Sequence, residues 1–206
     1  YKREPSFPIA VACDPAFNFV YEANIRYLHH LGEVTYFSPL ADTSLPDAGF
    51  VYLPGGYPEL YLAALSANRQ MLQSIRRYVE SGGKLLAECG GMMYLCDEIR
   101  DKNGYVYPMA GVLHQSATME NMKLRLGYRT LLYNETRLKG HEFHYSRLVE
   151  QQNPLPSCAV AYTAKGVETD TPLYHYKNVW AGYTHLYWAD PVGNEWFTKF
   201  VIDGNI

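Results

Sequence analysis

Three sites in this chain carry residue types that could together perform nucleophilic catalysis. Cys89 lies between Glu88 and the pair Gly90 and Gly91, where a predicted strand gives way to a predicted helix. Adjacent glycines permit the sharp turn that presents a nucleophile, and a helix N-terminus lowers the pKa of a thiol. The pattern therefore predicts a thiolate near neutral pH at Cys89, against the alternative that Cys89 is a small buried side chain.

The other two sites would supply the remaining groups of such a catalyst. Pro54-Gly55-Gly56 follows a predicted strand, and its backbone N–H groups could form an oxyanion hole with the amide of Gly90. His185 ends another predicted strand and could accept the thiol proton. Each has an ordinary alternative, namely a glycine turn or a structural histidine. Together they predict nucleophile, oxyanion donors and base at the carboxyl edge of one sheet, where open parallel sheets bind ligands.

Alternating strands and helices must position these residues. In the first hundred residues, apolar patterning predicts strands at 9–13, 34–37, 49–53 and 84–88, and helices at 20–31, 60–79 and 92–99. Strands and helices that alternate in this way predict an α/β fold, because the crossover helices cover both faces of a parallel sheet. We therefore expect a three-layer, flavodoxin-like, mostly parallel sheet with helices on both faces.

The second half of the chain has a different residue pattern from the first. Alternating, tyrosine-rich stretches occur at residues 105–113, 124–133 and 158–163, and tyrosine suits half-buried strands and cleft walls. These stretches predict antiparallel additions to the same domain. A final strand is predicted at residues 179–185 and a closing helix at residues 194–202. The chain shows no internal repeat and no linker that would mark a second domain.

Composition excludes several classes of protein. With 48% hydrophobic and 19% charged residues, the chain can bury a sizeable core and is no disordered tail. A net charge of −3 argues against nucleic-acid binding, which needs clustered Lys and Arg. No apolar run approaches the ~20 residues that span a bilayer, and no signal peptide is recognisable. The scattered cysteines, with no CxxC pair, fit a reducing compartment, so we expect a cytoplasmic protein without a membrane partner.

Four motifs resemble those of known glutamine-hydrolysing domains. Residues 53–59 (LPGGYPE), 87–95 (AECGGMMYL) and 182–186 (GYTHL) are similar to motifs of the class I glutamine amidotransferase fold. Residues 140–146 (GHEFHYS) more narrowly resemble a signature of the glutaminase domains of cobyrinic acid a,c-diamide synthases. The resemblance covers nearly the whole chain, from residue 8 to about residue 200.

The resemblance implies a specific chemistry for the candidate residues. Cys89 would attack the side-chain amide carbon of glutamine, forming a thioester and releasing ammonia. His185 would take the thiol proton and later activate the hydrolytic water. The amides of Gly56 and Gly90 would hold the tetrahedral oxyanion.

The resemblance also implies a division of labour within a longer polypeptide. Residues 1–206 would form the glutaminase domain, with residues 1–7 as the remnant of an interdomain linker. A preceding synthetase domain would use ATP and Mg²⁺ to activate the a and c carboxylates of a tetrapyrrole in cobalamin biosynthesis. That domain is expected to lie outside this chain, because no P-loop motif occurs here. The partners implied are therefore glutamine and the synthetase domain, which would carry most of the tetrapyrrole contacts, and no cofactor is expected in this domain.

One position departs from the class I pattern. A Glu would be expected two residues after the histidine, and the chain has Tyr187 there. What orients the imidazole is therefore open. Two alternatives follow, namely a catalytically silent amidotransferase-fold module that binds a partner, and a cysteine hydrolase of another small amide.

Several residues near these motifs have no glutaminase role that the sequence explains. On a strand, residues 141 and 143 share one face and residues 142 and 144 share the other, so the His-Glu-x-His cluster does not converge on one metal. We expect no metal site, and the resemblance instead places these residues at a substrate or interdomain contact. They are Tyr57, Glu59, His141, Glu142, His144, Tyr145 and Ser146.

Overall fold

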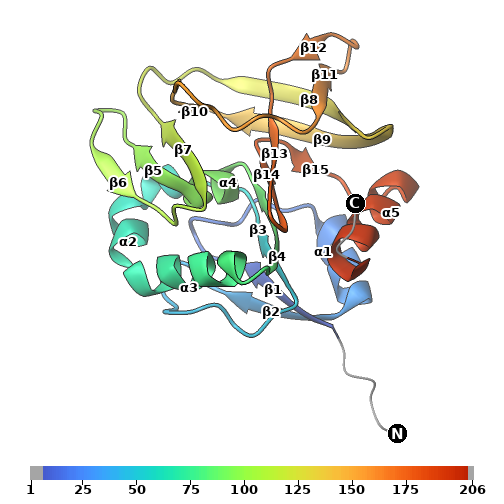
Figure 1. Ribbon diagram of the computed structural model, residues 1–206, viewed down its shortest axis with the longest axis horizontal. Coiled ribbons are helices and arrows are strands. Elements are labelled where there is room, and N and C mark those ends of the chain that lie inside the picture. Colours follow the sequence, from blue (N-terminus) through green and yellow to red (C-terminus); the bar gives the residue numbers. More distant parts are fainter. Residues whose placement is uncertain (1–6, 204–206) are drawn as a thin grey trace, which may run out of the picture.

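A computed structural model describes residues 7–203 of the chain, so the expected linker remnant at residues 1–7 lies, except for Phe7, outside the described residues. Its centre is a six-stranded sheet in the order β13-β14-β4-β3-β1-β2 (Figure 1). All neighbouring strands of this sheet are parallel except β13 with β14. The parallel order β2-β1-β3-β4-β14 is the flavodoxin-like one, which confirms the predicted topology. The strands are Pro8–Ala12 (β1), Glu33–Phe37 (β2), Phe50–Leu53 (β3), Lys84–Glu88 (β4), Leu173–Tyr176 (β13) and Val179–Gly182 (β14).

Helices cover both faces of the central sheet (Figure 1). Alternate residues of β1 divide between two apolar clusters, with Ala10 and Ala12 in one and Ile9 and Val11 in the other. The first cluster includes residues of Leu62–Ala67 (α2) and Arg69–Glu80 (α3). The second includes residues of Glu22–Leu31 (α1), Pro191–Thr198 (α5) and the π-helical turn Lys199–Asp203 (η2). The predicted three-layer architecture is confirmed, and no helix within residues 7–203 is long and apolar enough to cross a membrane.

The long helix predicted over residues 60–79 is two helices. A short 3-10 turn, Pro58–Leu60 (η1), precedes α2. Asn68 lies between α2 and α3 and interrupts the helix there. The side chain of Asn68 accepts a hydrogen bond from the backbone N–H of Met71 at 3.3 Å and thereby caps α3. Its amide also donates to the carbonyl oxygens of Pro39 and Asp42, both at 2.8 Å. An Asn that caps a helix gives no apolar signal, so hydrophobic periodicity ran across the break.

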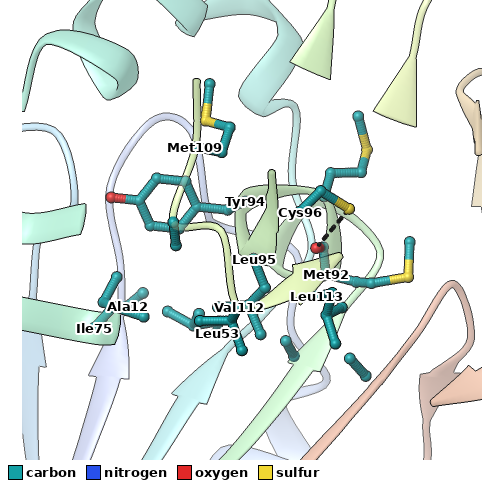
Figure 2. Close-up of a cluster of buried hydrophobic side chains, with 14 of the residues drawn as sticks. Ala12, Leu53, Ile75, Met92, Tyr94, Leu95, Cys96, Met109, Val112 and Leu113 are labelled. Carbon is teal, nitrogen blue, oxygen red and sulfur yellow. Dashed lines mark hydrogen bonds between the residues drawn. The ribbon is translucent and has the colours of Figure 1, made fainter. Parts of the chain in front are cut away.

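The helix predicted over residues 92–99 ends early. Helix α4 spans Gly90–Leu95, and Cys96–Arg100 forms strand β5 of a four-stranded sheet. Every residue of α4 is buried, so helical periodicity had no polar face to reveal its end. Figure 2 shows this buried cluster, in which the Cys96 thiol donates to the carbonyl oxygen of Met92 at 3.5 Å. The other strands of this sheet are Val106–Pro108 (β6), Leu113–Thr118 (β7) and Arg147–Leu148 (β10), so only part of the predicted stretch 105–113 is strand.

A third sheet supplies the predicted antiparallel additions. Its order is β12-β11-β8-β9-β15, and it lies across the end of the central sheet near α4 and β14 (Figure 1). Its long hairpin turns at Asn134 and Glu135, which both have positive φ, as tight hairpin turns require. The strands are Arg125–Tyr133 (β8), Thr136–His144 (β9), Val160–Thr163 (β11), Glu168–Thr169 (β12) and His185–Leu186 (β15).

The strand predicted over residues 179–185 is divided between two sheets. Strand β14 pairs with β4 in the central sheet, whereas β15 pairs with β9 in the antiparallel sheet. Tyr183 and Thr184 carry the chain from one sheet to the other. His185 therefore lies at the junction of the two sheets, opposite His141 of β9.

Candidate active site

The predicted sharp turn at Cys89 is present. Cys89 follows β4 directly and is the N-cap residue of α4, with φ 49° and ψ −107°. A non-glycine residue in this region costs roughly 1–3 kcal/mol, so the surrounding structure must hold it there. The backbone N–H of Cys89 donates to the carbonyl oxygen of Gly182 at 2.7 Å, which ties the turn to β14.

Glycines let the loop after β3 approach the Cys89 turn. A Cβ atom on Gly91 would lie 2.1 Å from the carbonyl oxygen of Leu53, so no side chain fits at this position. A Cβ atom on Gly90 would lie 3.2 Å from the backbone nitrogen of Gly56. The Gly56 and Gly90 backbones are therefore neighbours beside Cys89, as an oxyanion hole formed by their amides would need.

Cys89 opens onto a small cavity of about 10 Å³, enough for a single water molecule. Residues from three separate segments of the chain meet there: the loop after β3, the Cys89 turn, and the end of β9 with the residues that follow it. Cys89 itself is only 5% exposed. The predicted site residues that line the cavity are Gly56, Tyr57, Glu59, Cys89, His144, Tyr145 and Ser146, together with Met93 and Phe143.

His185 lies next to this cavity without lining it. Its ring packs so closely on the loop after β3 that a Cβ atom on Gly55 would lie 2.2 Å from Cε1. The other neighbour is the ring of Phe19, with 4.4 Å between ring centroids. The Cys89 thiol donates to the carbonyl oxygen of Phe143 at 3.6 Å, and the buried Nδ1 of His185 has no hydrogen-bond partner. The Cys89 thiol and the His185 imidazole are thus not hydrogen-bonded to each other in this structure.

Burial keeps the Cys89 thiol and the His185 imidazole neutral. It raises the pKa of the Cys89 thiol to about 12, with the Glu59 carboxylate adding to the effect and the Gly90 amide opposing it. It lowers the pKa of His185 to about 3, helped by the charges of His141 and His144. The prediction of a thiolate near neutral pH is therefore wrong for this resting site, because desolvation outweighs the N-terminus of the six-residue helix α4. A neutral imidazole can accept a proton, which is the state that a general base needs.

Glu88 is a site residue that sequence reasoning missed. Glu88 is 1% exposed, and its two hydrogen-bond partners, Tyr52 and Leu186, belong to the apolar cluster on the α1 and α5 face of the sheet. The Tyr52 hydroxyl donates to the Glu88 carboxylate at 2.6 Å, and the backbone N–H of Leu186 donates to it at 3.0 Å. Burial raises the pKa of Glu88 to about 8, although both hydrogen bonds oppose the rise. The signal was an acidic residue directly after the apolar run Leu85-Leu86-Ala87. The hydrogen bond from the Leu186 N–H to Glu88 fixes the backbone next to His185.

The segment after His185 is held from the other side by Asn24 of α1. The Asn24 amide donates to the carbonyl oxygen of Leu186 at 2.8 Å, and its side-chain oxygen accepts from the backbone N–H of Trp188 at 2.8 Å. Tyr187, which stands where a third catalytic residue was expected, is 38% exposed and packs edge-on against Tyr21. The backbone around His185 is thus fixed by buried side chains, while residue 187 faces the surface.

Replacing Glu88 with glutamine is expected to change how stability depends on pH. A carboxyl whose pKa is raised from 4.5 to about 8 by folding stabilises the protein below pH 4.5 and loses that contribution as the pH rises toward 8. His185, with a lowered pKa, has the opposite slope, but only below its ordinary pKa of 6.5. Between pH 6.5 and 8 the Glu88 effect therefore stands without that compensation and is worth about 2 kcal/mol, at ~1.4 kcal/mol per pH unit.

Urea unfolding at pH 6.5 and pH 8 measures this effect. The wild-type protein should lose stability between the two pH values, and Glu88→Gln should lose much less. Glu168→Gln, which changes an exposed carboxylate, serves as the control and should behave as wild type. An equal loss in wild type and Glu88→Gln would show that Glu88 does not gain a proton on folding.

Glu142 and His144 form a buried polar network beside the cavity. The Glu142 carboxylate is 1% exposed and receives the Arg129 guanidinium Nε at 2.5 Å and the Thr171 hydroxyl at 2.8 Å. His144 places Nε2 2.7 Å from the same carboxylate and Nδ1 2.8 Å from the carbonyl oxygen of Ser146. Burial alone would raise the pKa of Glu142, but the hydrogen bonds from His144 and Thr171 and the nearby positive charges lower it overall. Arg129 and Thr171 lie outside the motifs, and sequence reasoning missed them.

The predicted alternation along β9 is confirmed. Glu142 and His144 are buried on one face, whereas His141 is half-buried on the other, edge-on to the ring of Tyr128. The ring of His144 stacks on Tyr183 with 3.7 Å between centroids and 10° between planes. Within residues 7–203, no group of three or more His, Cys, Asp or Glu side chains could hold a metal ion.

Comparison with known proteins gives the family and relatives of this chain. Residues 8–192 match the family of CobB/CobQ-like glutamine amidotransferase domains. The chain is 40% identical over 185 residues to a hydrogenobyrinate a,c-diamide synthase of Pseudomonas aeruginosa, covering 87% of this chain and 41% of that protein. It is also 40% identical over 188 residues to a cobyrinate a,c-diamide synthase of Fusobacterium nucleatum, with the same coverage. The chain thus spans about two fifths of the length of these curated relatives.

Solved structures share the fold at low sequence identity. PurLQS from Thermotoga maritima matches with a TM-score of 0.59 and 16% identity, over 96% of each chain. A structure described as a glutamine amidotransferase matches with a TM-score of 0.58 and 16% identity, over 94% of this chain and 98% of that one. These likenesses show the architecture that surrounds the Cys89 turn.

Proposed function

Because this chain belongs to the family of CobB/CobQ-like glutamine amidotransferase domains, we propose that its Cys89 site hydrolyses the side-chain amide of glutamine. The observation that carries the proposal is the strained turn at Cys89, which presents a thiol beside the backbone amides of Gly56 and Gly90. A strained nucleophile flanked by two amide donors is the arrangement that acyl transfer requires.

The proposed reaction begins at the thiol. Cys89 Sγ forms a bond to the amide carbon of glutamine while its proton passes to the neutral imidazole of His185. The carbonyl oxygen becomes an oxyanion, which the amides of Gly56 and Gly90 stabilise. The carbon–nitrogen bond then breaks, and the imidazolium gives its proton to the departing nitrogen as ammonia.

The second half of the reaction restores the site. The γ-glutamyl thioester on Cys89 is attacked by a water molecule that gives its proton to His185. The carbon–sulfur bond breaks, the sulfur regains the proton, and glutamate leaves. Since the cavity has room for about one water molecule, glutamine must displace the surrounding side chains, and the half-exposed Tyr57 and Tyr145 are the residues we expect to move.

We further propose the use of the ammonia. The relatives are named for a,c-diamide synthesis on hydrogenobyrinate or cobyrinate, and this chain spans about two fifths of their length. A synthetase domain on the same polypeptide, binding ATP and Mg²⁺, would activate the a and c carboxylates of a tetrapyrrole for attack by ammonia. His141, which pairs with His185 between β9 and β15 and does not line the cavity, would contribute to a contact with that domain or its substrate.

Two alternatives are separated by one substrate comparison. A catalytically silent partner-binding module is favoured by the surface position of Tyr187 and by the lack of a hydrogen bond between the thiol and His185. A cysteine hydrolase of another amide would share the nucleophile. Ammonia release should be measured from glutamine, asparagine and small primary amides. The proposal expects release from glutamine far above the others, a silent module would release none, and another hydrolase would prefer a different amide.

A further inference from the structure

The Cys89 cavity contains one side chain that can carry a positive charge. Of the residues that line it, Glu59 is acidic, His144 is a histidine, and the others are not basic. Apart from Glu59, two more carboxylates act on Cys89, namely Glu88 and Glu142, and all three oppose ionisation of the thiol. A thiolate that forms in this cavity therefore needs a compensating charge, and His144 is positioned to supply it.

The hydrogen bonds of His144 determine how many protons its ring carries. Nδ1 lies 2.8 Å from the carbonyl oxygen of Ser146, which can only accept a hydrogen bond. Nε2 lies 2.7 Å from a carboxylate oxygen of Glu142, which also accepts when it is ionised. Both ring nitrogens must then be donors, and a ring with two N–H groups is an imidazolium.

The surroundings of Glu142 keep that carboxylate ionised. The Arg129 guanidinium and the Thr171 hydroxyl both donate to it, so two donors besides the His144 ring converge on one buried carboxylate. The Arg129 side chain is itself only 10% exposed, which limits screening by water. The flat stacking of His144 on Tyr183 fixes the plane of the ring and offers the imidazolium an aromatic face.

We propose that His144 is a fixed imidazolium in the wall of the Cys89 cavity that stabilises the Cys89 thiolate as it forms, with Glu142 as the positioning residue that keeps His144 protonated. This rests on the proposed function for its role in turnover, but the charge on His144 and its effect on Cys89 do not require glutamine. The arrangement divides the work between two histidines: neutral His185 moves the proton, and charged His144 stabilises the anion left behind.

The inference predicts slower alkylation of Cys89 when the charge on His144 is removed. Iodoacetamide reacts with the thiolate, so its rate of reaction at Cys89, followed by mass spectrometry with fragment-ion assignment, reports ionisation of the thiol. In the full-length protein, His144→Gln should lower the rate of Cys89 alkylation measured between pH 7 and 8 by about 10–10³-fold, the range expected for losing one nearby opposite charge. Glu142→Gln should lower this rate by less, because it loosens His144 without removing the ring.

The matched control is His114→Gln. His114 is also a histidine beside a carboxylate, with Nδ1 3.4 Å from Asp97, but the pair is exposed and outside the cavity. In the His114→Gln protein, the rate of Cys89 alkylation should match that of the wild-type protein. Three charged groups shift the pKa of His185, namely His141, His144 and Glu142. They do not affect the alkylation measurement through His185, because His185 stays neutral over the pH range of the experiment.

A second measurement does not depend on the variants folding. In ¹⁵N-histidine-labelled wild-type protein near neutral pH, both ring nitrogens of His144 should show the shifts of protonated nitrogens, whereas His185 should show one protonated and one bare nitrogen. A neutral His144 ring overturns the proposal. An unchanged alkylation rate in folded His144→Gln also overturns the proposal. If KM for glutamine rises in that variant while alkylation is unchanged, the charge on His144 binds the substrate carboxylate instead, and the proposal is again overturned. A lowered alkylation rate in His144→Gln of a protein that never hydrolyses glutamine would support this inference while contradicting the proposed function.

Discussion

Replacing Cys89 with serine is expected to lower glutamine-dependent ammonia release by at least about 10⁴-fold, the scale seen when a covalent nucleophile is removed. A serine hydroxyl ionises far less readily than a thiol, and the cavity that raises the pKa of the thiol to about 12 gives the hydroxyl no better activation. The side chains are nearly equal in size, so the fold and its thermal unfolding midpoint should change little. Steady-state ammonia release from glutamine measures the loss.

The same variant separates the two halves of the proposed reaction. Amidation supported by added ammonium salts should continue in Cys89→Ser full-length protein, because carboxylate activation would take place in the synthetase domain. Cys13→Ser serves as the control, since Cys13 is exposed and does not line the Cys89 cavity. Glutamine hydrolysis that persists in Cys89→Ser would remove Cys89 from the reaction altogether.

Replacing His185 with glutamine is expected to lower kcat for glutamine hydrolysis by about 10³–10⁴-fold, with a small change in KM. His185 is buried, neutral and packed against Gly55 in the loop that also carries Gly56. Glutamine keeps a polar side chain of similar length, so the packing against Phe19 should largely survive. Rapid-quench kinetics would show whether thioester formation is the step that fails.

An exposed histidine provides the comparison for His185. His30→Gln on α1 removes an imidazole at the surface and should leave kcat unchanged. A His185→Gln protein that folds normally and keeps a kcat near wild type would show that another group accepts the thiol proton.

The order of the central sheet and its layers followed from short-range patterns. Strands β1, β3 and β4 each carry an apolar run, and helices lie in the connections from β1 to β2 and from β3 to β4. The turn at Cys89 was also predictable, because the adjacent Gly90 and Gly91 permit a sharp backbone turn. These features depend on residues close together in sequence.

The rest depends on contacts between distant segments. The division of residues 179–186 between two sheets arises because β15 pairs with β9, about forty residues away in sequence. The cavity brings Tyr57, Cys89 and His144 together from three segments, and only the fold reveals that the last residues of the 140–146 motif face the nucleophile. The neutral state of Cys89 was missed for the same reason, since a helix N-terminus is visible in sequence and desolvation is not.

The most direct test of a glutamine-hydrolysing Cys89 is covalent labelling by a chloroketone analogue of glutamine. The analogue presents an electrophilic carbon where the amide carbon of glutamine would lie, so it should form one thioether per chain, at Cys89, and excess glutamine should slow the reaction. Intact mass and peptide mass spectrometry measure both. No adduct, or an adduct spread over Cys13 and Cys158 and unaffected by glutamine, would contradict the account.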